Sequence, residues 1–169
     1  YRVTKRACEE LIEEYQNQFG LPYIILRFGT IYGPYADDRN SVFRYVSQAI
    51  ESGEINYVGS GAEIREYIHV IDAVKQAATL ANQDKKNIKY LITGNSPTRT
   101  RDLFELIGEV LGKSVKVNYD RGARGKSSHY KISPYAYRED HALKVNNDTY
   151  IDLGQGVLDL VHHLNPKPD

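Results

Sequence analysis

Residues 20–34 read GLPYIILRFGTIYGP, and the fold is decided around this stretch. Gly20 and Pro22 end the helical pattern that precedes them, since glycine commonly follows a helix and proline cannot continue one. The run YIILRF at 23–28 is apolar and rich in β-formers, which is typical of a strand buried in a parallel sheet. Residues 29–40 are rich in Gly, Pro, Asp and Tyr, which predicts a loop.

The helix before this stretch is predicted from its periodicity. Val3, Ala7, Leu11 and Tyr15 are spaced four apart, which indicates an apolar stripe that faces a core. Four glutamates fill the positions between them and are expected on the solvent face. Residues 1–20 are therefore expected to form an amphipathic helix.

Helical and strand patterns alternate through the rest of the chain. Further helices are expected at 41–52, 72–81, 100–111 and 155–164, and further strands at 55–58, 66–70, 89–93 and 115–119. Ser41, Asp72 and Thr100 are the expected N-caps. Strands that alternate with helices predict an α/β fold with a largely parallel sheet.

Composition and charge exclude several classes of function. The chain has 169 residues, enough for one domain with a core, and 22 basic residues balance 22 acidic ones. A protein that grips nucleic acid normally carries a positive excess, so we expect no nucleic-acid partner. No run of about 18 apolar residues is present, so no membrane span is expected.

Two residue counts bear on the compartment and on the length of the protein. A single cysteine, Cys8, excludes an internal disulfide framework and disfavours a structural metal site, and a reducing, cytoplasmic location is the simplest expectation. The chain contains no methionine and starts at Tyr1, so we expect it to be a fragment of a longer protein.

One pair of side chains suggests acid–base chemistry. Tyr1 and Lys5 lie four apart in the predicted helix and therefore emerge from one face. An ammonium held beside a phenol stabilises the phenolate, which can then exchange a proton with a substrate hydroxyl. Taken alone, this spacing is better explained by a solvated helix face.

Two further segments, LRFGTIYGP at 26–34 and REYIHVIDAV at 65–74, follow the Tyr-x-x-x-Lys spacing in order. Together the three motifs resemble the extended short-chain dehydrogenase/reductase superfamily and, within it, the NAD-dependent nucleotide-sugar epimerases and dehydratases. The resemblance implies the C-terminal part of a Rossmann-type parallel sheet plus a smaller α/β substrate-binding lobe. The cofactor domain would include 1–34 and 65–95, and the lobe would include 35–64 and 96–169.

The resemblance also implies roles for individual residues. Tyr1 would be the catalytic acid/base, Lys5 would favour its phenolate form and hydrogen-bond the nicotinamide ribose, and Phe28 would lie beside the nicotinamide. The implied substrate-binding positions are Thr30, Ser41, Arg65 and Arg124. Arg65 matches the arginine that binds the substrate diphosphate, for which a guanidinium fork is well suited.

Alternatives remain open at several of these positions. Thr30 stands where the family often has Asn, and Asn40 is an alternative to its neighbour Ser41. Arg65 would also fit an ion pair with a surface carboxylate, and Lys126 replaces the acidic residue expected near Arg124. His69, in a predicted strand, is interpreted as a packed core histidine.

The implied function is an NAD(P)-dependent nucleotide-sugar epimerase or dehydratase, in which the tyrosine removes a proton from a sugar hydroxyl while NAD or NADP takes the hydride. A nucleotide-sugar 4-reductase, or a non-catalytic nucleotide-sugar-binding or interaction module, are the alternatives. No Gly-x-x-Gly-x-x-Gly loop occurs in these residues, so the isolated chain is expected to be inactive. The intact protein is expected to be a homodimer.

Overall fold

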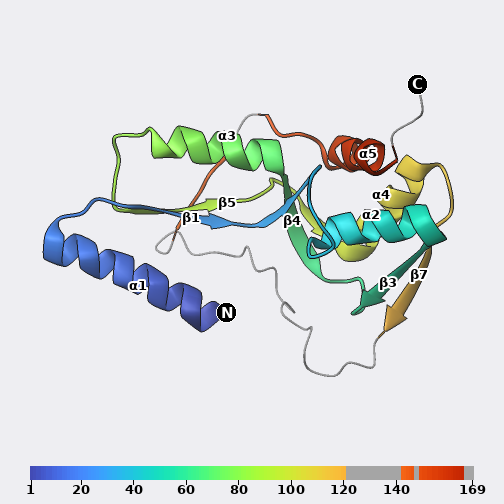
Figure 1. The fold of residues 1–169 in the computed structure, drawn as a ribbon, viewed down its shortest axis with the longest axis horizontal. Coiled ribbons are helices and arrows are strands. Elements are labelled where there is room, and N and C mark those ends of the chain that lie inside the picture. The colour runs from blue at the N-terminus through green and yellow to red at the C-terminus, as the bar shows by residue number, and fades with distance from the viewer. Residues whose placement is uncertain (121–141, 147–148, 166–169) are drawn as a thin grey trace.

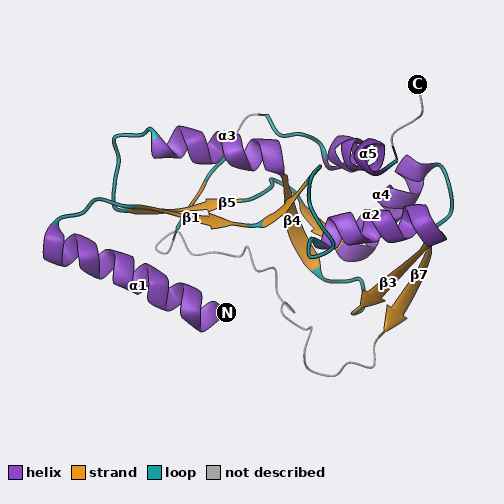
Figure 2. Cartoon of the chain, viewed as in Figure 1, coloured by secondary structure: helices purple, strands orange, loops and turns teal. Residues whose placement is uncertain are grey.

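A computed structural model of the chain describes residues 1–120, 142–146 and 149–165. The helices are α1 (Arg2–Phe19), α2 (Ser41–Ser52), α3 (Val70–Ala81), α4 (Thr100–Leu111) and α5 (Leu153–Leu164). The strands are β1 (Ile24–Phe28), β2 (Thr30–Tyr32), β3 (Glu54–Val58), β4 (Ile64–His69), β5 (Ile88–Ile92), β6 (Pro97–Arg99), β7 (Lys116–Asp120) and β8 (Leu143–Lys144). Helices and strands alternate along most of the chain, so the predicted α/β class is confirmed (Figures 1 and 2).

The strands within the described residues form three small sheets rather than one. One sheet has the order β1-β5-β8, with parallel pairing throughout. A second has the order β2-β4-β6, in which β2 and β4 are parallel and β4 and β6 are antiparallel. The third pairs β3 with β7 in parallel. The prediction of largely parallel pairing is confirmed, and the antiparallel β6 is an addition.

The chain passes from the first sheet to the second at Gly29, between β1 and β2. A Cβ at this position would lie 2.3 Å from Thr93 Oγ1, so only glycine allows the backbone to approach so closely. The segment 29–40, which the sequence predicts to be a loop, contains the short strand β2 directly after Gly29. This strand depends on β4 for its hydrogen bonds, and a local sequence pattern does not reveal such a partner.

Two hydrophobic clusters hold the fold together. The larger one joins α2, α4 and α5 and contains Val42, Val46, Leu103, Ile107, Val157 and Leu160, among others. The smaller one lies around β1, β4, β5 and α3 and is formed by Ile68, Ala73, Leu80, Tyr90 and Ile92. Figure 1 shows α3 and α1 on opposite faces of the β1–β5 pair, while α2, α4 and α5 gather near β3 and β7. None of the described helices is long and apolar enough to cross a membrane.

The orientation of α1 differs from the prediction. None of its residues is buried, and the stripe of Val3, Ala7, Leu11 and Tyr15 is exposed. Glu9 is instead the first residue of α1 to be partly covered, because it faces basic side chains on the sheet. The prediction that the apolar stripe faces a core is therefore wrong for the part of the chain that the structure describes.

The predicted caps are displaced by one to three residues. Asn40 rather than Ser41 caps α2, and its Oδ1 accepts hydrogen bonds from the backbone N–H groups of residues 42 and 43. His69 rather than Asp72 caps α3, and Arg99 precedes α4, in which Thr100 is the first residue. Asp72 is buried in the first turn of α3, where its Oδ2 accepts a hydrogen bond from the backbone N–H of Ile151.

Candidate functional site

The N-terminal end of α1 carries the predicted catalytic pair. Lys5 Nζ lies 5.6 Å from the centroid of the Tyr1 ring, so the two side chains share one face of the helix as their spacing predicts. The Tyr1 side chain is 95% exposed, and Lys5 is exposed as well. The phenol and the ammonium are therefore both accessible to a ligand.

Ion pairs attach α1 to the sheet. Arg27 of β1 donates two hydrogen bonds to Glu9, from Nε to Oε1 at 2.8 Å and from Nη2 to Oε2 at 2.5 Å. Lys89 of β5 lies 2.7 Å from Glu13 Oε1 and 3.7 Å from Glu9 Oε2. The hydrogen bond from Arg27 is the main reason why the pKa of Glu9 is lowered, and the same contact raises the pKa of Arg27.

These ion pairs fix the direction of α1 relative to β1. Glu13 accepts a hydrogen bond from the Tyr23 hydroxyl just before β1, whereas Glu9 contacts Arg27 near the end of that strand. The helix therefore runs antiparallel to β1 (Figure 1). Tyr1 lies about 12 Å further along the helix axis than Glu9, beyond the carboxyl end of the strand. Phe28, the last residue of β1, is exposed at this same end.

The predicted substrate-binding residues are distributed over three elements. Thr30 is the first residue of β2 and is paired with Tyr67 of β4. Arg65 lies two residues earlier in β4, is paired with Thr98 of β6, and shares a face of the strand with Tyr67. Ser41 is half-buried at the start of α2.

Arg124, the remaining predicted substrate-binding residue, lies outside the described residues. The structure therefore brings Tyr1, Lys5 and Phe28 to one end of the β1 strand, and it places Thr30 and Arg65 on adjoining strands of the second sheet.

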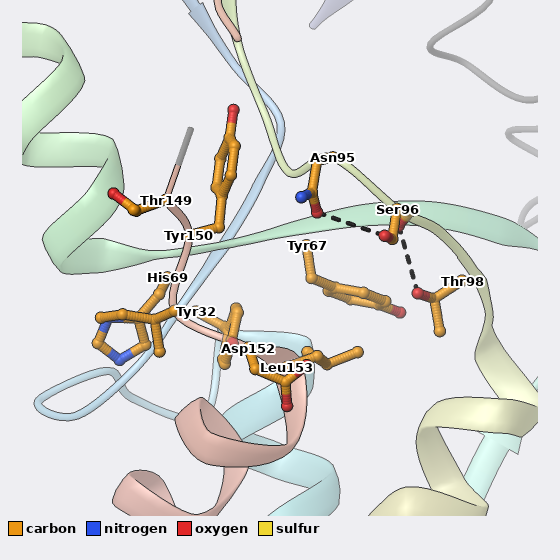
Figure 3. A pocket seen from close by; sticks show the side chains of 11 residues that line it. Tyr32, Tyr67, His69, Asn95, Ser96, Thr98, Thr149, Tyr150, Asp152 and Leu153 are labelled. Carbon is orange, nitrogen blue, oxygen red and sulfur yellow. Dashed lines mark hydrogen bonds between the residues drawn. The ribbon is translucent and has the colours of Figure 1, made fainter. Parts of the chain in front are cut away.

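A cavity of about 470 Å³ opens where β2 and β4 end (Figure 3). It is bounded by these two strands, by the loop that follows β5 and by the segment that precedes α5. Its lining residues are Tyr32, Tyr67, His69, Asn95, Ser96, Thr98, Thr149, Tyr150, Ile151, Asp152 and Leu153. None of the predicted site residues that the structure describes lines this cavity, so sequence reasoning missed it.

Two buried polar groups lie in the wall of the cavity. The Tyr32 hydroxyl and His69 Nε2 are buried and, within the described ranges, have no hydrogen-bond partner. His69 Nδ1 accepts a hydrogen bond from the backbone N–H of Ile71 at 3.3 Å, so the neutral ring carries its proton on Nε2. Burial lowers the pKa of His69 and raises the pKa of Tyr32, which keeps both side chains uncharged.

Both atoms are closed off from solvent, because a Cβ at Gly156 would lie 2.3 Å from the Tyr32 hydroxyl oxygen and a Cβ at Gly33 would lie 3.2 Å from His69 Nε2. The two groups therefore face the backbone at these glycines and are not presented to a ligand in the cavity. His69 is buried, as the sequence predicts for a core histidine. Whether His69 Nε2 has a hydrogen-bond partner depends on the segments that pack around the ring. The local sequence pattern around residue 69 does not predict which segments those are.

Curated relatives of the chain are nucleotide-sugar enzymes. The UDP-glucuronate 4-epimerase of Thermodesulfobacterium geofontis is 26% identical over 119 residues, which cover 70% of this chain and 37% of that protein. The dTDP-glucose 4,6-dehydratase 1 of Escherichia coli K12 is 24% identical over 141 residues, which cover 83% of this chain and 37% of that protein. The chain thus spans about two fifths of the length of these relatives.

Solved structures share the fold. The UDP-glucuronic acid 4-epimerase of Bacillus cereus, in complex with UDP-glucuronic acid and NAD, superposes with a TM-score of 0.79 at 20% identity, over 96% of this chain and 51% of that one. The UDP-glucose 4-epimerase of Thermus thermophilus, in complex with NAD, gives a TM-score of 0.69 at 19% identity, over 99% of this chain and 54% of that one. At these identities the similarity establishes the Rossmann-like fold.

The family follows from the sequence match. The sequence profile of the NAD dependent epimerase/dehydratase family matches residues 1–93, which is more than half of the chain and includes α1, β1, β2 and β4. The chain therefore belongs to the NAD-dependent epimerase/dehydratase family.

Proposed function

We propose that the protein that contains these residues is an NAD-dependent nucleotide-sugar epimerase or dehydratase, with Tyr1 as its acid/base. The observation that carries this proposal is the contact between Lys5 and the Tyr1 ring, held beyond the carboxyl end of β1 in a chain of this family. The named activities of the relatives, on UDP-glucuronate and on dTDP-glucose, support a sugar nucleotide as substrate.

The exposed residues at the end of α1 suit the cofactor that the family name implies. The hydroxyl of Tyr1 and the three N–H donors of Lys5 would hold a ribose hydroxyl group, and the exposed ring of Phe28 would cover one face of a flat nicotinamide. NAD, when bound, supplies the hydride chemistry. Lys5 stabilises the phenolate form of Tyr1, and this phenolate takes the proton from the sugar hydroxyl at the carbon that is oxidised and becomes the neutral phenol.

Substrate binding is assigned to the second sheet and the lobe beyond it. We propose that Arg65 binds the diphosphate and that Thr30, Ser41 and Arg124 contact the rest of the sugar nucleotide. Segments 1–34 and 65–95 would belong to the cofactor domain, and 35–64 and 96–169 to the substrate lobe. The separate hydrophobic cluster around β1, β4, β5 and α3 supports that division. The intact protein is proposed to be a homodimer.

The decisive experiment is Tyr1→Phe in the full-length protein, assayed with NAD on UDP- and dTDP-hexoses. We expect kcat to fall by about 10²–10⁴-fold, because the general acid/base is lost, while the Kd for the sugar nucleotide changes little. Tyr15→Phe on the same helix is the matched control and should retain its activity. Undiminished turnover of Tyr1→Phe would remove Tyr1 from the mechanism.

The same assay separates the alternatives. Net oxidation of NADPH by a keto-sugar nucleotide would identify a 4-reductase, which uses the same tyrosine and lysine. Binding of a sugar nucleotide without turnover by the full-length protein would identify a non-catalytic binding module. The isolated chain of 169 residues remains predicted to be inactive, and the assay tests that as well.

A further inference from the structure

Glu9 lies between two sets of positive charges. Arg27 binds both of its oxygens, at 2.8 and 2.5 Å, and Lys89 lies 3.7 Å away. Lys5 is one helical turn before Glu9, and side chains four apart on a helix are neighbours. Tyr1, Lys5, Glu9 and Glu13 follow each other at this spacing, so all four lie near one face of α1.

Lys5 therefore has two neighbours that compete for its ammonium group. The Tyr1 ring lies 5.6 Å from Lys5 Nζ on one side, and the Glu9 carboxylate lies one turn away on the other. A carboxylate attracts an ammonium more strongly than the face of a phenol ring does, because it carries a full negative charge. Lys5 would thus turn towards Glu9 if nothing else occupied the carboxylate oxygens.

We propose that Arg27 is a positioning residue for the Tyr1–Lys5 pair, because its bidentate hydrogen bonds to Glu9 keep that carboxylate from drawing Lys5 away from Tyr1. The inference rests on the proposed function of Tyr1 and Lys5. A planar guanidinium matches the two oxygens of a carboxylate, which a single lysine does not. The Glu9 side chain is only 18% exposed, so water screens this contact weakly.

The other charged groups that face Glu9 do not replace Arg27. Lys89, from β5, is closer to Glu13 at 2.7 Å than to Glu9. Glu13 lies one turn further along α1 and repels Glu9 rather than pairing with it. Among the described residues, Arg27 and Lys89 are the charged groups that lower the pKa of Glu9, and the hydrogen bond from Arg27 is the larger cause. By helical spacing Lys5, Arg6 and Glu13 lie within about one turn of Glu9, and Arg6 is already paired with Glu10.

A kinetic test compares two variants that break the same ion pair in the full-length protein. In Arg27→Met, the Glu9 carboxylate is free to pair with Lys5, and Lys5 then no longer stabilises the Tyr1 phenolate. The acidic limb of the kcat/KM pH profile should therefore move up by about one pH unit, and kcat/KM at neutral pH should fall about tenfold. In Glu9→Gln, the ion pair is equally lost but no carboxylate competes for Lys5, so the limb should stay in place.

Two further variants complete the kinetic comparison. Adding Glu9→Gln to Arg27→Met should restore the profile to within about threefold in kcat/KM, since no competing charge remains. Arg6→Met is the matched control, because Arg6 pairs with Glu10 on the exposed side of the same helix. An equal shift of the limb in Glu9→Gln and Arg27→Met would overturn the proposal and leave the ion pair a purely structural contact.

A second measurement needs no activity and keeps the inference separate from the proposed function. The pKa of the Glu9 carboxyl is followed by carbon NMR in the same full-length protein. In Arg27→Met it should remain below the ordinary value of about 4.3, and adding Lys5→Met should raise it. In the wild type, Lys5→Met should leave it nearly unchanged, because Arg27 occupies both oxygens. A Glu9 pKa in Arg27→Met that does not respond to Lys5→Met would overturn the proposal even if the enzyme is active.

Discussion

α1 and α2 are both amphipathic, but they are attached to the molecule in different ways. α2 buries Val42, Tyr45, Val46 and Ala49 in the larger hydrophobic cluster. α1 buries no residue, and its ion pairs and hydrogen bonds to the described part of the sheet run from Glu9 and Glu13 to basic and hydroxyl groups. An apolar stripe in the sequence therefore predicts that a helix has an apolar face, but it does not predict that this face is buried against the same chain.

The difference between the two helices implies that global stability and the position of the proposed catalytic pair depend on different interactions. The lobe built on α2, α4 and α5 is held by dense apolar packing, which depends little on pH or salt. The helix that carries Tyr1 and Lys5 is positioned by charges, which respond to both. We therefore expect substitutions in the lobe to change global unfolding and substitutions around α1 to change the local position of the helix.

The largest expected effect compares the same substitution in the two regions. Leu103→Ala removes a fully buried side chain from the larger cluster and should lower the free energy of unfolding by about 3–4 kcal/mol, because a cavity is left. Leu11→Ala on α1 removes a side chain that is 58% exposed and should cost less than about 0.5 kcal/mol. Urea unfolding of both variants measures the difference. Equal losses would mean that the apolar face of α1 is covered in solution.

A second comparison sets a buried ion pair against an exposed one. Lys144 Nζ lies 2.8 Å from Glu66 Oε2, and these side chains are 15% and 6% exposed. Lys144→Met should cost about 3 kcal/mol, because Glu66 is left as an uncompensated buried charge. Lys116→Met breaks an exposed surface pair with Glu54 and should cost far less, because solvent screens that pair. Thermal or urea unfolding distinguishes them, and similar losses would contradict the burial of Glu66.

The long elements could be predicted from the sequence because their signals are local. The helices at 41–52 and 100–111 end at glycines with a left-handed backbone, as their patterns indicate. The short strands β2, β6 and β8 could not be predicted, since two or three residues become a strand only when a partner from elsewhere supplies the hydrogen bonds.

The candidate site was predictable only in part, for the same physical reason. The proximity of Tyr1 and Lys5 follows from helical spacing, and the structure shows it. The cavity beside Tyr32 and His69 and the contact of Arg27 with Glu9 join segments far apart in the chain, and no local pattern encodes them. The unexpected orientation of α1 has a similar origin. Its acidic face lies against the sheet because Glu9 and Glu13 pair with the basic side chains of β1 and β5.

A smaller effect tests which residue caps α2. Asn40 Oδ1 accepts two backbone hydrogen bonds at 3.1 and 3.2 Å, and its Nδ2 donates to the carbonyl oxygen of Ile31 at 2.8 Å. Asn40→Ala should therefore cost about 1–2 kcal/mol, whereas Ser41→Ala should cost less than about 0.5 kcal/mol. Unfolding of the two variants measures this. A larger loss of unfolding free energy for Ser41→Ala than for Asn40→Ala would mean that Ser41, as the sequence predicts, is the N-cap of α2.

The smallest expected effect is the pH dependence of α1. The pKa of Glu9 is lowered in the folded chain, chiefly by its hydrogen bond from Arg27, so its contribution to stability is present above the unfolded pKa of about 4.3 and is lost as the pH falls through the lower folded value. We expect the free energy of local opening of α1, measured by amide exchange and corrected for intrinsic exchange rates, to decrease at pH values below about 4. The decrease should be no more than about 1 kcal/mol, because Arg27 is 38% exposed.

Helix α4 is the internal reference for this measurement, since its buried face is apolar and should retain its protection over the same range. Glu9→Gln should make α1 weakly protected at every pH and remove the transition, whereas Glu10→Gln, which breaks the exposed pair with Arg6, should leave it in place. A transition that persists in Glu9→Gln would show that another carboxylate holds α1. Glu13, at 2.7 Å from Lys89, would then be the residue that attaches the helix to the sheet.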